Sequence, residues 1–440
     1  MTVDNMLEQY SKARSGSKKL HEQAERVFSA NGATHFGRVA DPFRPYITHA
    51  KGSRKWDVDG NEYIDYVMGH GSLILGHSHP DVVRALQEQV AKGVHYGDNH
   101  ELEIEWAELI KGMMPGMDRV EFCSCGQEAN LLAVNLARIF TGRKRILRFD
   151  ESFHGWAGEV CPPGTPGVIN DQVTSIPMHD LSLVEKELAT KEYAILMTEG
   201  GGAHMAGQVP WNENFIRALP AITRKHGTIW LIDEVVTGFR EAPGGWQSVV
   251  GVTPDLTSIG KTIGGGLAVG AVGGRMDIMD ILKPKASPQN FLIHTGTWNA
   301  NPLTASAGVA ACRHYQDGLV QDKVRQLGAS LREKGNEVIK ELKISARLYG
   351  RSIVHLYFGP IEFEPKDATW PPAKDMSLIA QEKATKLRLM MQLYSRNIAT
   401  IGARLFIMST AHTEEDINQT VKAFRDSLEA MIDEGSLKRD

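Results

Sequence analysis

The chain has 440 residues, a hydrophobic content of 42% and a formal net charge of −4 at pH 7. This length allows two domains with a large core, and the composition is typical of a globular protein. Basic and acidic residues are interspersed, which argues against binding to nucleic acid or to a membrane surface. No stretch has the apolar run of a signal peptide or reaches membrane length, so we expect a cytoplasmic protein.

The cysteines and paired histidines do not indicate a metal site. Four cysteines are too few for a disulfide framework, and the spacing of Cys123 and Cys125 does not suit a zinc knuckle. His77 and His79 lie together without a third ligand at useful spacing. We therefore interpret these residues as structural and expect no bound metal.

Residues from about 5 to 30 are polar with an apolar side, which predicts one or two amphipathic helices. Such an arm cannot form its own core, so we expect it to pack on the body of the protein or on another subunit. Further along, Asp59-Gly60 separates two alternating segments and predicts a β-hairpin.

Short apolar segments near residues 120, 146, 193, 229 and 255 predict strands, with helical segments between them. This alternation predicts an α/β fold with a mostly parallel sheet and crossover helices. All candidate site residues in this region lie just past strand ends, where open α/β sheets bind their ligands.

The tail of the chain predicts a second, smaller α/β unit. Helices are expected at 320–342, 374–395 and 413–434, and strands near 345–358 and 397–409. We expect three regions: an N-terminal arm with part of the small domain (1–75), a large domain (76–316) and a C-terminal small domain (317–440).

The strand that ends at Cys123 leads into Ser124-Cys125-Gly126-Gln127-Glu128, which opens a long helix. A tight turn of small residues at a helix N-terminus presents free backbone N–H groups to an anion. We therefore expect an anionic group to bind at this turn.

The apolar run 228–232 ends in Asp233 and Glu234, and the next strand stops at Lys261, which Gly264-Gly265-Gly266 follows closely. A buried lysine is costly unless it is paired or used covalently. Pyridoxal phosphate needs such a pair, because its aldehyde forms a Schiff base with a lysine and its ring nitrogen pairs with a carboxylate. From these residues alone, a lysine on a solvated loop remains an equal alternative.

Two segments resolve that choice: Leu-Ile-Asp-Glu-Val-Val-Thr-Gly-Phe-Arg, which begins at Leu231, and Ser-Ile-Gly-Lys-Thr-Ile-Gly-Gly-Gly-Leu, which begins at Ser258. Both resemble the class III aminotransferases of fold type I, in the branch that contains glutamate-1-semialdehyde aminomutase and the β-amino-acid and D-phenylglycine aminotransferases. The resemblance implies a pyridoxal 5′-phosphate enzyme with a mostly parallel sheet in its large domain and a small α/β domain formed by both termini.

The resemblance also implies roles for individual residues. Lys261 and Asp233 become the catalytic pair, and Phe153 would stack on the cofactor ring. Thr297 would reach the phosphate of the neighbouring subunit, which implies a homodimer with shared active sites. The implied cofactor contacts are Ser124, Cys125, Gly126, Gln127, Phe153, Glu199, Asp233, Val235, Lys261 and Thr297.

Three residues are implied as substrate ligands. Arg38 and Arg404 lie where relatives bind carboxylates; the alternatives are a surface arginine for Arg38 and an exposed strand-end arginine for Arg404. His154 either orients the substrate or packs.

The chain departs from the family pattern at several of these positions. The phosphate turn has Cys125-Gly126-Gln127-Glu128 in place of Ser-Gly-Thr-Glu, so the backbone and Gln127 must do more, or the phosphate binds more weakly. Phe153 replaces the usual tyrosine and has no hydroxyl to donate. Glu199 is followed by Gly200, where the family usually has proline.

The expected function is an aminotransferase that moves an amino group between a carboxylate-bearing donor, such as a β-amino or aromatic amino acid, and an α-keto acid. The alternative is a glutamate-1-semialdehyde 2,1-aminomutase. Against it stand His70, where aminomutases tend to have tryptophan, and a short segment 156–180, where they have a long Gly/Ser-rich lid. A non-catalytic anion-binding module, with Gly264-Gly265-Gly266 as its loop, is the alternative of a different class, and it lacks a nucleotide fingerprint.

Overall fold

The computed structural model describes residues 3–29, 42–284, 291–375, 377–380 and 383–440. Two compact units make up the chain. The larger unit comprises Gly71–Ile74 and Pro80–Lys323, and the smaller unit comprises Met1–His70, Leu75–His79 and Val324–Asp440.

A seven-stranded sheet forms the centre of the larger unit, with the strand order β4-β12-β11-β10-β7-β5-β6. β12 pairs antiparallel with both of its neighbours, and the remaining pairs are parallel. The predicted, mostly parallel sheet is therefore confirmed. The strands are β4 (Arg119–Cys123), β5 (Arg145–Phe149), β6 (Val173–Ile176), β7 (Tyr193–Glu199), β10 (Ile229–Glu234), β11 (Leu256–Gly260) and β12 (Gly270–Gly274).

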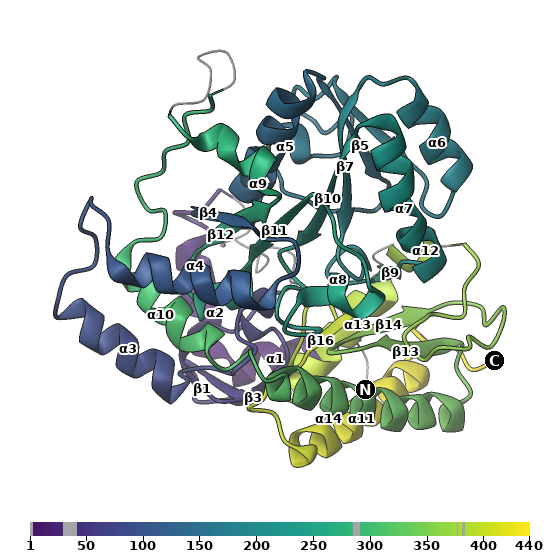
Figure 1. Ribbon diagram of the computed structural model, residues 1–440. Helices are drawn as coiled ribbons and strands as arrows, with labels where there is room; N and C mark the ends of the chain where they lie inside the picture. Colours follow the sequence, from purple (N-terminus) through teal and green to yellow (C-terminus); the bar gives the residue numbers. More distant parts are fainter. Residues whose placement is uncertain (1–2, 30–41, 285–290, 376, 381–382) are drawn as a thin grey trace. The chain divides into compact units, whose positions relative to one another are not determined.

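Helices cover both faces of this sheet (Figure 1). Alternate residues of each strand belong to different apolar clusters: Ile195 and Leu231 pack with α5, whereas Leu196 and Ile232 pack with residues of α6, α7 and α8. This alternation follows from the two-residue period of a strand and explains why these strands are apolar on both sides. The helices are α5 (Gly126–Thr141), α6 (Leu181–Ala189), α7 (Glu213–His226), α8 (Gly245–Val250) and α9 (Met276–Met279).

Three further helices of the larger unit pack together, with α10 lying against both α3 and α4. A small two-stranded ribbon, β8 with β9, follows the end of β7. These elements are α3 (Pro80–Val90), α4 (Glu101–Met113), α10 (Pro302–Cys312), β8 (Gly202–Ala203) and β9 (Val209–Pro210).

The smaller unit contains two sheets, with the strand orders β1-β2-β3-β15 and β13-β14-β16. β2 and β3 pair antiparallel across Asp59-Gly60, so the predicted hairpin is confirmed. The strands are β1 (Ile47–Lys51), β2 (Arg54–Asp57), β3 (Glu62–Asp65), β13 (Ala346–Gly350), β14 (Ile353–Phe358), β15 (Ile398–Ala399) and β16 (Leu405–Ile407), and the helices are α1 (Val3–Ala13), α2 (Ser15–Ala24), α11 (Leu319–Leu342), α12 (Ser377–Ala380), α13 (Ala384–Ser395) and α14 (Glu414–Asp433).

The N-terminal arm packs on the body of the smaller unit, as expected. The hydroxyl of Tyr10 donates to the carbonyl of Phe43 at 2.9 Å. Arg14 is buried and donates to the Tyr63 hydroxyl at 2.5 Å and to the carbonyl of Tyr394 at 2.8 Å. The arm is therefore held by specific polar contacts as well as by its apolar side.

Strands occur in region 397–409, as expected. The segment splits into β15 and β16, which belong to different sheets. Gly402 and Ala403 between them adopt positive φ values of 60° and 49°, a conformation that breaks an extended strand. Likewise, the helix expected at 374–395 is the short α12 followed by α13. No helix among the described residues is long and apolar enough to span a membrane.

Candidate active site

Three neighbouring strands of the larger unit end side by side. The register aligns Glu199 on β7 with Asp233 on β10, and Asp233 with Ser258 on β11. Residues paired across neighbouring strands point to the same face, so these three polar side chains line the α5 side of the sheet. Lys261 follows directly after β11.

Asp233 is a buried acceptor surrounded by neutral donors. Its Oδ2 accepts from Asn130 Nδ2 at 2.7 Å and lies 2.9 Å from His154 Nδ1, and its Oδ1 accepts from the backbone N–H of Val235 at 3.0 Å. Asp233 is 6% exposed, so this carboxylate lies at the floor of the site.

Lys261 has a half-buried side chain, and no hydrogen bond or ion pair joins its amine to another residue of the described ranges. Its φ is 47°, in the left-handed region that only glycine enters readily. Burial lowers the pKa of Lys261, although the charge of Asp233 and, where it is ionised, that of Glu199 favour the protonated amine. An amine without a partner and with a lowered pKa is suited to act as a nucleophile.

Glu199 connects two loops at the mouth of the site. Its Oε1 accepts the backbone N–H of Phe153 and that of His204, each at 2.7 Å. Burial, followed by the charge of Asp233, raises the pKa of Glu199 to about 8. At neutral pH the protonated acid therefore predominates.

The phosphate turn lies at the N-terminus of α5, where the first backbone N–H groups lack helical partners and the Cys125 side chain does not cap them. Glycine is required here: a Cβ on Gly126 would lie 2.7 Å from Val235 Cγ2, and Val235 also borders Gly260. Val235 thus holds the turn against the strand that carries Asp233. Backbone donors for an anion are in place.

The carbonyl oxygen of Gln127 binds the backbone of a neighbouring segment. Its Oε1 accepts the backbone N–H of Trp156 at 2.7 Å and that of Ala157 at 3.2 Å. The side chain therefore anchors the segment after His154. The backbone is a source of phosphate donors, as the sequence allowed, and the contribution expected of Gln127 stays a prediction, which its Nε2 amide would have to supply.

Phe153 is 48% exposed although it is a large apolar ring. Glu199 fixes its backbone, and its ring lies edge-on to His204 with centroids 6.3 Å apart. The exposed face of Phe153 is available to another flat ring.

Glu234 has a structural role, in contrast to its neighbour Asp233. It points to the opposite face of β10, where its carboxylate accepts the backbone N–H groups of Trp246 at 2.7 Å and Gln247 at 2.8 Å and the hydroxyl of Thr237 at 2.7 Å. It is fully buried and caps the first turn of α8. Of the two carboxylates at this strand end, only Asp233 faces the lysine.

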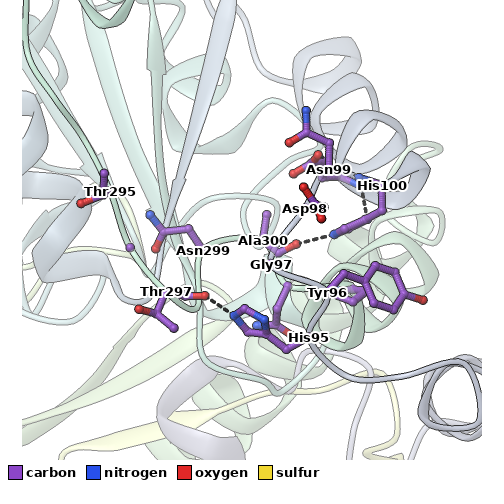
Figure 2. A pocket seen from close by; sticks show the side chains of 14 residues that line it. His95, Tyr96, Gly97, Asp98, Asn99, His100, Thr295, Thr297, Asn299 and Ala300 are labelled. Atoms are coloured by element: carbon purple, nitrogen blue, oxygen red, sulfur yellow. Dashed lines mark hydrogen bonds between the residues drawn. The ribbon is translucent and has the colours of Figure 1, made fainter.

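Thr297 is exposed and lines a pocket of about 430 Å³ between segments 95–103 and 295–302. Figure 2 shows His95 directed at the carbonyl of Thr297 and His100 directed at that of Ala300, 2.9 Å away. In the same segment, Asn299 accepts from the hydroxyl of Ser124 at 3.2 Å. The segment that carries Thr297 is thus tied to the phosphate turn of its own chain.

The three expected substrate ligands are placed differently. Arg38 lies outside the described residues. Arg404 belongs to the smaller unit and is 8% exposed, so the alternative of an exposed arginine is wrong. His154 is 2% exposed and directed at Asp233. This burial leaves the His154 ring no surface for a substrate, so packing against Asp233 is the better interpretation.

Three buried polar residues of the site were missed from the sequence. Asn130 lies on α5, Ser258 on β11, and Arg148 on β5, where it donates to the carbonyl of Val160 at 2.5 Å. Each is at most 1% exposed. The sequence did contain a signal for these residues, because a polar residue within an otherwise apolar strand or helix face requires a hydrogen-bond partner.

These features fit pyridoxal phosphate: backbone N–H donors for the phosphate, a buried carboxylate for the ring nitrogen, an exposed flat ring and an amine without a partner. A site of this kind at the strand ends of an α/β sheet defines a pyridoxal-phosphate enzyme.

Comparison with known proteins identifies the family. Residues 36–160 and 167–353 match the family described as aminotransferase class-III, and the chain belongs to it. It is a pyridoxal-phosphate-dependent aminotransferase of fold type I, as solved relatives such as a transaminase with its cofactor bound support.

Both branches of the expected function occur among the relatives. A glutamate-1-semialdehyde 2,1-aminomutase of Methylacidiphilum infernorum is 33% identical over 433 residues, covering 94% of this chain and 98% of that protein. An omega-transaminase from Sphaerobacter thermophilus is 31% identical, with a TM-score of 0.85 and coverage of 94% and 97%. A β-phenylalanine aminotransferase from Variovorax paradoxus is 26% identical, with a TM-score of 0.88 and coverage of 99% and 98%.

Proposed function

We propose that the protein transfers an amino group from a carboxylate-bearing donor, a β-amino or aromatic amino acid, to an α-keto acid, with Lys261 and Asp233 as catalytic residues. The omega-transaminase and β-phenylalanine aminotransferase similarities support this choice. We also propose that the enzyme is a cytoplasmic homodimer, and that the two compact units correspond to the large and small domains of the fold.

When bound, pyridoxal phosphate supplies an aldehyde that captures amines and a ring that accepts electrons. Lys261 Nζ would hold the aldehyde and, once released, would move a proton to and from the donor carbon as general base and acid. Asp233 would keep a proton at the ring nitrogen. The N-terminus of α5 would bind the phosphate, and Phe153 would cover one face of the ring and exclude water there.

The observation that carries the choice of aminotransferase is the anchoring of segment 156–180. Gln127 binds its first residues, Arg138 pairs with Glu159 at 2.7 Å, and Asn170 Nδ2 donates to the carbonyl of Pro162 at 2.7 Å. An aminomutase must keep its intermediate enclosed, whereas an aminotransferase must release its product. A short, tied segment favours release.

Arg38 and Arg404 are proposed to bind substrate carboxylates, because a guanidinium binds a carboxylate through two parallel hydrogen bonds. Thr297 is proposed to serve the phosphate of a partner subunit, which its exposure permits. His154 is proposed to position Asp233 instead of touching the substrate.

Glutamate-1-semialdehyde 2,1-aminomutase is the second candidate, since relatives with that name are 31–33% identical over most of the chain. A donor panel separates the two. The purified enzyme is mixed with β-phenylalanine, D-phenylglycine, L-alanine or glutamate-1-semialdehyde, and the absorbance of the bound cofactor is followed. Conversion to the amine form by one of the first three establishes the aminotransferase. Rapid formation of 5-aminolevulinate without a keto acid would instead establish the aminomutase.

A further inference from the structure

A chain of buried polar contacts lies beneath the site and crosses three elements of the larger unit. Ser258 Oγ on β11 lies 2.6 Å from Asn130 Oδ1 on α5. Asn130 Nδ2 lies 2.7 Å from Asp233 Oδ2 on β10 and 2.9 Å from the backbone carbonyl of His154. Ser258, Asn130 and His154 are at most 2% exposed, so water does not replace these contacts.

The chemistry of the neighbours fixes the orientation of the Asn130 amide. An ionised carboxylate and a backbone carbonyl only accept hydrogen bonds, so the amide group that faces Asp233 and His154 must be the NH₂. The amide oxygen then faces Ser258, whose hydroxyl must donate. Only an asparagine side chain, with two donors and an acceptor, satisfies all three neighbours at this position.

The same reasoning fixes the proton on His154. Its Nδ1 faces the Asp233 carboxylate and therefore donates. Its Nε2 is buried and finds no hydrogen-bond partner within the described ranges. Burial lowers the pKa of His154, although its hydrogen bond to Asp233 opposes this effect. The buried Nε2 without a partner and the lowered pKa together favour a neutral ring with its proton on Nδ1.

Asn130 also connects the two ends of the cofactor site. It lies four residues after Gly126, in the first turns of the helix whose N-terminus presents the phosphate donors. One Nδ2 thus ties that helix to Asp233 on β10 and to the loop that follows β5. Together with the packing of Val235 on Gly126, this side chain holds the phosphate donors and the carboxylate at a fixed distance.

We propose that Asn130 is a positioning residue that fixes the distance between the phosphate turn and Asp233 and holds His154 in the neutral, Nδ1-protonated form. This inference rests on the proposed role of Asp233 towards the ring nitrogen. It adds a residue that acts through Asp233 and touches neither cofactor nor substrate.

Two variants of Asn130 and one matched control test the proposal. Asn130→Asp keeps the volume but presents an acceptor where a donor is needed, and Asn130→Ala removes the group. Asn170→Ala is the control, because Asn170 is also buried in the larger unit and donates through Nδ2 to two backbone carbonyls, away from Asp233. For each holoenzyme, the cofactor dissociation constant, the ¹⁵N resonances of His154 and the melting temperature are measured.

Asn130→Ala is expected to weaken binding of pyridoxal 5′-phosphate on the order of 10-fold, and Asn130→Asp by about 100-fold. In the wild type, the Nε2 resonance should lie in the range of an unprotonated nitrogen. In Asn130→Asp it should move towards the range of a protonated nitrogen, because a second carboxylate then lies beside Asp233, the partner of His154 Nδ1, and its charge favours the protonated ring. Asn170→Ala should lower the melting temperature and change neither cofactor affinity nor the His154 resonances.

A protonated Nε2 in the wild type, or cofactor affinities within twofold for both Asn130 variants, would overturn the proposal. If Asn130→Asp does not fold, Asn130→Ala with the wild-type resonance still decides the question. The resonance requires no turnover. A failure of the proposed function, such as transamination by a variant without Lys261, would therefore leave this test intact.

Discussion

Asp65 and Asp233 are both buried carboxylates at strand ends, one in each compact unit, but their partners differ in charge. Asp65 pairs with the amine of Lys55 at 2.7 Å and with His77 Nε2 at 2.8 Å, and it accepts two backbone N–H groups. Within the described part of the chain, Asp233 accepts from an amide, an imidazole and one backbone N–H, and the amine of Lys261 has no hydrogen-bond or ion-pair partner there.

The balance of charge around the two aspartates, Asp65 and Asp233, differs accordingly. Burial alone would raise the pKa of Asp65, but Lys55 and His77 hold that pKa well below its usual range. The charge of Asp65 is therefore balanced by partners within the smaller unit, and these contacts stabilise that unit. Among the described residues, no lysine or arginine lies within salt-bridge distance of Asp233, and we propose that its histidine partner His154 is neutral. A site that must bind a protonated ring nitrogen keeps a charge available for it.

The two lysines provide the strongest test of this difference. Lys261→Ala should lower turnover by roughly 10⁴-fold, because one amine serves as both nucleophile and proton carrier. The melting temperature of the cofactor-free protein should not fall, since this amine has no partner to lose. Lys55→Ala should do the reverse, costing about 3–5 kcal/mol of stability by leaving the buried Asp65 without its lysine partner, with turnover per folded molecule retained. Activity assays measure the turnover of both variants, and thermal melts measure their stability. Transamination by Lys261→Ala would refute the catalytic role of Lys261.

The two aspartates give the next test. Asp233→Asn should reduce turnover on the order of 10²- to 10³-fold, because the amide cannot hold a proton on the ring nitrogen. It should cost the cofactor-free protein little stability. Asp65→Asn should leave Lys55 and His77 without their counter-charge and lower the melting temperature strongly. Equal loss of stability in the two variants would remove the distinction between a structural and a functional carboxylate.

Glu199 gives a third test, a dependence of stability on pH. Its pKa is about 8 in the folded protein, against 4.5 for an ordinary glutamate. Between these values the folded protein holds a proton that the unfolded chain releases. The free energy of unfolding should therefore fall as pH rises from about 4.5 to 8, by up to ~1.4 kcal/mol per pH unit.

Glu199→Gln imitates the protonated acid and can still accept the N–H groups of Phe153 and His204. Its melting temperature should therefore change less between pH 5 and pH 8 than that of the wild type. Thermal melts of the cofactor-free proteins across this range measure the difference. Parallel curves for the two proteins would show that Glu199 does not titrate there.

The sequence by itself determined the sheet, because the strands are short apolar runs with helical segments between them and the parallel order follows from crossover connections. It also located Asp233, Lys261 and the phosphate turn, because residues at strand ends and helix N-termini have their surroundings set by local structure. Lys261 and its glycines could be recognised in this way before any contact was known.

Only the tertiary structure decided which polar groups meet. Asp233 and Glu234 are adjacent in the chain, yet one faces α5 and the other caps α8, since successive residues of a strand point to opposite faces. Asn130 lies over 100 residues from Asp233 in the chain, and its two donors acquire a function only because α5 packs on β10. Hydrogen bonds require distances and angles, which pattern and composition do not contain.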